Sequence, residues 1–212
     1  MIDNTKIDKE AESTPPSGSG RLVIINYGAG NIQSIKFAFK RLGIDAVLSD
    51  DAEEIKAADK VIFPGVGEAS SAMAKLKATG LDKIIPTLKQ PVLGICLGMQ
   101  LMCKHSTEGD TTGLGIFNVD VVKFSKEVKV PQIGWNEITD LQSELLTSIT
   151  ENSHMYLVHS YYAPKCAEMI ATTHYELDYA SALQKENFYG VQFHPEKSGV
   201  VGEQILKNFL SL

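Results

Sequence analysis

The chain has 212 residues, 43% of them hydrophobic, and its 26 acidic residues outnumber its 20 lysines and arginines, giving a net charge of −6. This size and composition suit one globular domain with a substantial core, and the acidic balance argues against nucleic acid as a partner. No apolar run approaches the roughly 20 residues that span a bilayer, and the N-terminus shows no signal pattern, so a membrane is not an expected partner either.

Residues 1–20 are polar and charged, and they end in a run rich in proline, glycine and serine. Such a segment has too little apolar surface to fold, so we expect a disordered extension or a tail left from expression. The folded domain is expected to cover residues 21–212.

The first half of that domain alternates short apolar segments with amphipathic ones. The sequence predicts strands at 21–26, 46–49 and 61–63. A predicted helix begins after Asn31, a possible cap, and ends at Gly43, and a second predicted helix, 69–79, ends at Gly80. This alternation is typical of an α/β fold in which helices cover both faces of a sheet.

The apolar run 91–93 leads into Gly94-Ile95-Cys96-Leu97-Gly98, the G-x-C-x-G pattern of a nucleophile on a tight turn between a strand and a helix. Small residues on both sides allow the turn, which exposes the thiol at the start of a helix predicted over 97–105. There the helix dipole and free backbone N–H groups favour the thiolate. A buried structural cysteine is the alternative interpretation, because free cysteine is among the most buried residue types.

Beyond about residue 116 the pattern changes to several strands with few helices. The sequence predicts strands at 117–124, 155–158, 169–173, 182–185 and 189–193, followed by a helix at 203–210. Together with the first half, these segments predict a single-domain α/β fold with a mixed central sheet flanked by helices.

His194 and Glu196 lie near the C-terminus, on either side of Pro195. On an extended segment their side chains would project to the same side, so that Glu196 can orient the imidazole that serves Cys96 as a base. A structural histidine and a solvated glutamate are the alternatives for each residue alone. Together with the cysteine turn, the pair predicts a Cys-His-Glu triad of Cys96, His194 and Glu196.

These two motifs resemble those of the class I glutamine amidotransferases, and further segments resemble the glutaminase subunits of imidazole glycerol phosphate synthase. The additional segments are Tyr27–Asn31, Pro64–Gly67, Gly113–Gly115, Gly134–Asn136 and Val158–Tyr162. The resemblance runs from about residue 21 to residue 212. It implies an amidotransferase-like fold, L-glutamine as the substrate, and no metal or organic cofactor.

The resemblance also assigns residues to the substrate site. Attack on a carboxamide forms an oxyanion that needs backbone donors, and the N–H of Leu97 beside the nucleophile can supply one. The resemblance implies that the second donor comes from the loop that contains Gly65 and Val66. It further implies substrate contacts from Gly67, Gln100, His159, Ser160 and Tyr161.

The partner implied by the resemblance is a (β/α)₈ barrel cyclase that would use the released ammonia to make imidazole glycerol phosphate and an aminoimidazole carboxamide ribotide. The residues expected to dock this partner in a heterodimer are Asn31, Ile133, Gly134, Trp135 and Asn136. Because the odd number of cysteines has no metal-type spacing and suits a reducing compartment, the expected location is the cytoplasm.

Two positions depart from the family pattern. The chain has Gln132-Ile133 where the family usually has His-Met, and Asn26 where many relatives have Asp. The first departure keeps open a paralogue that feeds another barrel synthase, such as one that aminates a surface-sugar precursor. A catalytically silent regulatory subunit is a further alternative, which an intact triad disfavours.

Overall fold

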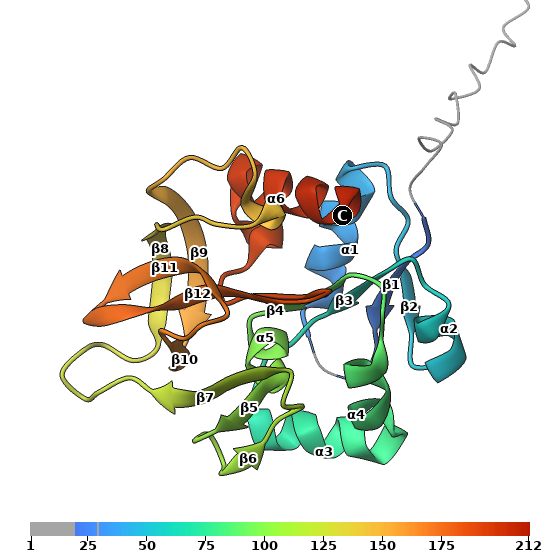
Figure 1. Ribbon diagram of the computed structural model, residues 1–212, viewed down its shortest axis with the longest axis horizontal. Helices are drawn as coiled ribbons and strands as arrows, with labels where there is room; N and C mark the ends of the chain where they lie inside the picture. The colour runs from blue at the N-terminus through green and yellow to red at the C-terminus, as the bar shows by residue number, and fades with distance from the viewer. Residues whose placement is uncertain (1–19, 29) are drawn as a thin grey trace, which may run out of the picture.

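The computed structural model describes residues 20–28 and 30–212 (Figure 1). The expected extension at 1–20 therefore lies, except for Gly20, outside the described residues. Within the described part, no helix is both long enough and apolar enough to cross a membrane.

Most of the helices are short. The α-helices are α1 (Ile32–Arg41), α2 (Ala52–Lys56), α3 (Ala69–Thr79), α4 (Leu81–Ile84), α5 (Leu97–Met102) and α6 (Gly199–Ser211), and the 3-10 helices are η1 (Ile85–Thr87), η2 (Glu144–Leu146) and η3 (Pro195–Lys197). Helix α3 has the predicted bounds. It ends at Gly80 with φ 73°, a left-handed conformation that glycine adopts readily.

The strands form one large sheet and one separate pair. They are β1 (Leu22–Ile25), β2 (Val47–Ser49), β3 (Lys60–Phe63), β4 (Val92–Ile95), β5 (Cys103–Ser106), β6 (Thr111–Thr112), β7 (Phe117–Lys123), β8 (Gln132–Ile138), β9 (Ser153–His159), β10 (Tyr161–Pro164), β11 (Met169–Tyr175), β12 (Leu177–Lys185) and β13 (Phe188–Val191). The large sheet has the order β2-β1-β3-β4-β13-β12-β10-β7-β5-β6, with β11 paired to β12, while β8 pairs with β9. Parallel pairs around β4 and antiparallel pairs around β12 confirm the predicted mixed central sheet.

Alternation along the central strands builds a core on each face of the sheet. Leu22 and Ile24 pack in the core that α1 and α6 cover, whereas Val23 and Ile25 pack in the core that α3 and α5 cover (Figure 1). All four side chains are at most 1% exposed. Full burial of each such side chain contributes roughly 1.5–3 kcal/mol, so the two covered faces fix the position of the strands.

The strands β4 and β13 are parallel neighbours, with Ile95 paired to Val191. Parallel strands end at the same edge of a sheet, so the segments that follow them begin side by side. Cys96 follows β4, and the segment from Gln192 to His194 follows β13. The topology therefore brings the two sequence motifs together at the edge of the sheet where these central strands end.

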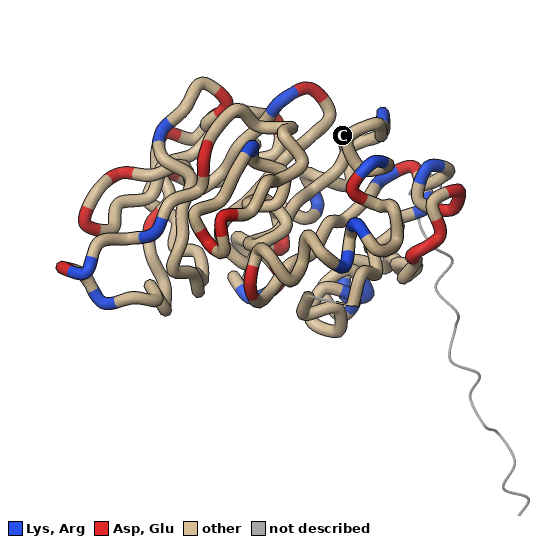
Figure 2. The backbone as a smooth tube through the Cα atoms, turned by 90° about the horizontal axis from the view of Figure 1, so that it is seen from below, with Lys and Arg blue, Asp and Glu red and all other residues tan. Residues whose placement is uncertain are grey.

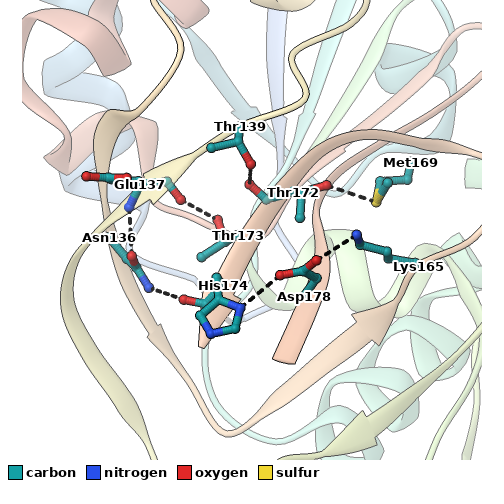
Figure 3. Close-up of polar contacts among 9 residues, drawn as sticks. All are labelled: Asn136, Glu137, Thr139, Lys165, Met169, Thr172, Thr173, His174 and Asp178. Carbon is teal, nitrogen blue, oxygen red and sulfur yellow. Dashed lines mark hydrogen bonds and ion pairs between the residues drawn. The ribbon is translucent and has the colours of Figure 1, made fainter. Parts of the chain in front are cut away.

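The ribbon β8–β9 is fastened to the large sheet through β11 (Figure 3). Thr139, just after β8, forms an isolated bridge with β11. Thr173 Oγ1 donates to the carbonyl of Glu137 at 2.9 Å, and Asn136 Nδ2 donates to the carbonyl of His174 at 2.8 Å. These bonds hold the ribbon against the sheet without making it part of the continuous ladder.

Acidic and basic residues are mixed along the described backbone (Figure 2). Several form exposed pairs within one helix, such as Lys56 with Glu53 and Lys207 with Glu203, each at 2.9 Å. Exposed pairs of this kind contribute roughly 0–1 kcal/mol, so burial rather than surface charge accounts for the stability of the fold.

The structure corrects three local expectations. The helix predicted over 97–105 is shorter, because Cys103 begins β5, which pairs with β7. Asn31 precedes α1 without a capping bond from its side chain. His194 is extended, with φ −102° and ψ 91°, but Pro195–Lys197 form the turn η3 instead of continuing an extended segment.

Candidate active site

Cys96 is the single residue between β4 and α5, and it has φ 53° and ψ −110°. A positive φ is rare for a residue with a side chain, and such strained conformations, which cost roughly 1–3 kcal/mol, cluster at functional sites. The N–H of Cys96 donates to the carbonyl of Val191 at 2.8 Å, which ties the turn to β13. The strand-turn-helix geometry predicted around the cysteine is thus present.

Glycines make room for this turn. A Cβ on Gly94 would lie 2.9 Å from the backbone N of Met99, and a Cβ on Gly98 would collide with the carbonyl oxygen of Phe63. Gly190 on β13, which the sequence did not single out, is also required, because its Cβ would collide with the side chain of Met99. The G-x-C-x-G spacing is therefore a packing requirement of a helix that starts directly behind the sheet.

His194 and Glu196 meet, although through a turn and not along an extended segment. Nδ1 of His194 lies 2.9 Å from Oε1 of Glu196, and both side chains are almost fully buried. The N–H of His194 donates to the carbonyl of Tyr156 at 2.9 Å, and the Ser198 hydroxyl donates to the carbonyl of His194 at 2.6 Å. These bonds fix the ring and leave Nε2 as the nitrogen that can serve Cys96.

The pKa of His194 reflects these two partners. Burial lowers this pKa, but the hydrogen bonds and charges of Cys96 and Glu196 raise it by more, so that the pKa of His194 is raised to about 10. The imidazole is therefore protonated at neutral pH while it contacts the cysteine. A protonated imidazole beside a sulfur nucleophile is the form that can give a proton to a leaving group.

Cys96 and His194 border a cavity of about 340 Å³. The residues predicted from the sequence that line it are Val66, Gly67, Cys96, Leu97, Gln100, His159, Ser160, Tyr161 and His194. Gly65 does not line the cavity but backs its wall, where a Cβ would lie 2.8 Å from the Cβ of Leu97. The predicted catalytic and substrate residues are thus gathered around one space large enough to admit an amino acid.

Glu108 and Lys197 also line this cavity, although the sequence did not single them out. Oε2 of Glu108 accepts from the N–H of Ala69 at 2.9 Å, at the start of α3. The pKa of Glu108 is raised above its usual value, because burial and the charge of Glu68 raise it by more than the Ala69 hydrogen bond lowers it. No local pattern marks Glu108, because a turn after β5 brings it to the cavity only in the folded chain.

His159 is a fixed part of the cavity wall. Its Nδ1 lies 2.8 Å from the carbonyl oxygen of Tyr161, and its Nε2 lies 3.1 Å from the hydroxyl of Tyr179. The pKa of His159 is lowered to about 4, because burial and, to a smaller extent, the charge of His194 lower it by more than the Tyr161 hydrogen bond raises it. With both ring nitrogens engaged inside the protein, His159 is not available as a base.

The residues predicted to dock a partner lie outside the cavity. Ile133 and Trp135 on β8 are 61% and 56% exposed. The Trp135 ring lies 5.9 Å from the ring of Tyr156, and the Lys197 ammonium lies 5.9 Å from the centre of that same ring. Because Lys197 lines the cavity, this row of side chains connects the exposed face of the ribbon to the rim of the site.

Gly134 and Asn136 take part in the structure of the ribbon. Gly134 has φ 134°, a backbone conformation that favours glycine. The amide of Asn136 is engaged with His174 on β11, as Figure 3 shows. Asn31 is partly exposed at the start of α1.

Comparisons with known proteins agree with this geometry. The family model for glutamine amidotransferase class-I matches residues 23–212. The chain is 53% identical over 195 residues to imidazole glycerol phosphate synthase subunit HisH of Bacteroides thetaiotaomicron, covering 91% of this chain and 100% of that protein. It is 44% identical over 191 residues to the subunit of the same name from Haemophilus influenzae, covering 89% and 96%.

Solved structures show the same fold. The crystal structure of a glutamine amidotransferase superposes with a TM-score of 0.71 at 18% identity and covers 89% of this chain and 97% of its own. From the family model and the close relatives, this chain belongs to the class I glutamine amidotransferases, within the family of imidazole glycerol phosphate synthase HisH subunits.

Proposed function

We propose that this chain hydrolyses L-glutamine to glutamate and ammonia and supplies the ammonia to a cyclase subunit in histidine biosynthesis. The observation that carries the proposal is the placement of a strained, cavity-facing Cys96 against a protonated His194 that Glu196 orients. The names of the relatives support the pathway, since they are subunits of imidazole glycerol phosphate synthase.

In the proposed reaction, the Cys96 thiolate attacks the side-chain carbonyl carbon of glutamine and forms a tetrahedral oxyanion. The carbon–nitrogen bond then breaks, His194 protonates the departing ammonia, and a γ-glutamyl thioester remains on the sulfur. His194 next takes a proton from water, which attacks the thioester and releases glutamate and the thiolate. Glu196 holds the imidazole in place and stabilises its charge throughout.

The oxyanion would be held by two backbone donors near the thiol. Leu97 supplies the N–H next to the nucleophile, and the 65–67 loop, which borders the cavity through Val66 and Gly67, supplies the second. Gly67 has φ 97°, so this loop contains a glycine hinge beside the donor. We expect a partner contact to turn the loop into its active arrangement, which makes hydrolysis slow in the isolated chain.

The amino-acid end of glutamine would be held by the remaining wall. Glu108 offers a carboxylate for the substrate ammonium group, and such charge-assisted bonds are about twice as strong as neutral ones. Gln100 and the backbone of 159–161 would bind the rest of the substrate. Specificity for glutamine then follows from a carboxylate and an amide that line the same cavity as the thiol.

The ammonia must reach its acceptor as the neutral molecule, because ammonium is not a nucleophile. We propose that a barrel cyclase docks on the face formed by Asn31 and the exposed residues Ile133 and Trp135, giving a cytoplasmic heterodimer that forms imidazole glycerol phosphate and an aminoimidazole carboxamide ribotide. The row from Trp135 through Tyr156 to Lys197 would place this contact at the rim of the cavity.

The test is glutamate release by the wild-type chain, alone and with the cyclase subunit and an acceptor analogue. We expect a slow basal rate that rises with the partner, loss of hydrolysis by a factor on the order of 10⁴ or more in Cys96→Ala, and little change in Cys166→Ala, the matched cysteine control. A glutamine-analogue electrophile should label Cys96 alone. Full activity in Cys96→Ala would contradict the assigned chemistry. A hydrolysis rate that is the same with and without the partner would contradict the proposed coupling.

A further inference from the structure

A continuous set of hydrogen bonds links the cavity wall to the sulfur of Cys96. Nε2 of Gln100 donates to the carbonyl of Tyr161 at 2.8 Å and to Oε1 of Gln192 at 2.8 Å. Nε2 of Gln192 lies 3.7 Å from Sγ of Cys96 and donates to it. Gln192 is 0% exposed, so it makes this contact without competition from solvent.

The network determines which end of each amide faces which partner. A backbone carbonyl only accepts hydrogen bonds, so the end of Gln100 that meets Tyr161 is its NH₂ group. That NH₂ group needs an acceptor on Gln192, which places the Gln192 oxygen toward Gln100 and the Gln192 NH₂ toward the sulfur. The direction of donation to Cys96 is therefore set by a fixed backbone group and not by a free choice of rotamer.

The position of Gln192 is also fixed by the sheet. Its N–H donates to the carbonyl of Ser181 on β12 at 2.8 Å, directly after β13 ends. The same parallel strand ends that place His194 beside Cys96 thus place Gln192 there as well. A buried donor held from both backbone and side chain is preorganised for a charge on the sulfur.

We infer that Gln192 is a further catalytic residue of this site, which donates an N–H to the Cys96 sulfur and fixes the Gln100 amide with its oxygen available to the substrate. A donor to the sulfur favours the thiolate over the thiol. Since both N–H groups of Gln100 are engaged, only its carbonyl oxygen remains to accept from a ligand. The inference rests on the proposed function for the identity of the ligand, but the contact with the sulfur does not.

Other titratable groups near the sulfur are few among the described residues. Tyr27 and Tyr179 both lie close enough for their charges to interact with Cys96, and burial raises the pKa of each phenol far above the physiological range. His194, with its pKa raised to about 10, stays charged below that pH. His159, with its pKa lowered to about 4, and Glu108 also line the cavity, but they are present in every variant. A difference between a Gln192 variant and the wild type in the acid range of Cys96 reactivity therefore reports the donor on Gln192.

The test measures the rate of Cys96 alkylation by iodoacetamide against pH, with the modified peptide quantified by mass spectrometry. Gln192→Met keeps the length of the side chain and removes both polar ends, while Gln192→Glu keeps an acceptor for Gln100 and replaces the donor with a carboxylate. Gln184→Met is the matched control, a glutamine on β12 whose amide contacts Tyr189 instead of the site. Thermal unfolding of each variant checks that it is folded.

In Gln192→Met we expect the acid limb of the alkylation profile to move upward by about one pH unit, the equivalent of about 1.4 kcal/mol, with no shift in Gln184→Met. Gln192→Glu should move the acid limb at least as far. This variant tests the inference if Gln192→Met does not fold. Profiles of folded Gln192 variants that coincide with the wild type would overturn the inference. If the Gln192 variants show the shift but the wild-type chain does not hydrolyse glutamine, the result would support the contact and refute only the proposed function.

Discussion

Cys96, His194 and Glu196 are at most 8% exposed, whereas Ile133 and Trp135 on the β8–β9 ribbon are 61% and 56% exposed. The first group is held by strand ends, glycine contacts and buried hydrogen bonds, so its geometry is complete within this chain. The ribbon buries Met155 and Leu157 in the core but leaves Ile133 and Trp135 exposed, with the Trp135 ring beside Tyr156. This contrast supports the proposal that the chemistry is built inside the subunit and that a partner controls it through the exposed ribbon.

The largest effect in this comparison is expected from removing the proton-transfer group of the buried region, His194. His194→Asn should lower kcat/KM for glutamine by roughly 10²–10⁴-fold, since a general acid and base is lost. Glu196→Gln should cost less, because it only orients and stabilises the imidazole. Steady-state kinetics of both variants, with circular dichroism as a check on folding, would test these roles. A larger loss of kcat/KM in Glu196→Gln than in His194→Asn would contradict them.

The next effect concerns the stability of the buried wall in acid. The pKa of His159 is lowered to about 4, from an unfolded value near 6.5, so between these values the unfolded chain binds a proton that the folded chain does not. The free energy of unfolding should therefore fall as pH drops from 6.5 to 4, by up to about 3 kcal/mol from this residue. Denaturant unfolding of the wild type and His159→Gln checks this, and an equal acid loss in both would contradict it.

A smaller change would separate binding from chemistry. Glu108→Gln keeps an oxygen to accept from Ala69 but removes the charge that we assign to the substrate ammonium, so kcat/KM should fall by roughly 10- to 100-fold, mainly through KM. Glu68→Gln is the matched control, a neighbouring glutamate outside the cavity lining. If kcat fell with KM unchanged, Glu108 would belong to the chemical step and not to binding.

The smallest effect should appear on the ribbon and only in the presence of a partner. Trp135→Ala should weaken cyclase binding by about 2 kcal/mol, or roughly 30-fold in Kd, while the basal glutaminase rate and Tm of the isolated chain stay the same. Val200→Ala, an exposed apolar residue on α6, is the control. Titration calorimetry with the cyclase subunit measures the difference, and unchanged affinity would move the docking face elsewhere.

The sequence predicted the local geometry around Cys96 because the signals for it are local. The glycines around Cys96 report a close helix behind a strand, and Gly80 reports a left-handed helix end, so both elements appear where they were expected. The predicted proximity of His194 and Glu196 is also present, although it arises from the turn at Pro195–Lys197. A conformation that a short segment requires, such as a glycine beside a tight turn, can be predicted from a single sequence.

The remaining parts depend on contacts between distant segments. The strand β8 has no clear apolar alternation and exists through pairing with β9, and β5 replaces a predicted helical turn through pairing with β7. Glu108 and Gln192 reach the site only because the fold brings their segments there. When long-range pairing brings a residue to the site, no local spacing pattern in the sequence predicts its position there.

The central position of β13 has a consequence for synthesis. This strand lies between β4 and β12 but follows every other strand in the described chain, so the middle of the sheet stays open until β13 has been made. Before that, Cys96 lacks both its backbone tether to Val191 and the neighbours that activate it. Such long-range pairing is slow to form. A nascent or truncated subunit would therefore carry an unactivated thiol, and it would not hydrolyse glutamine until β13 is in place.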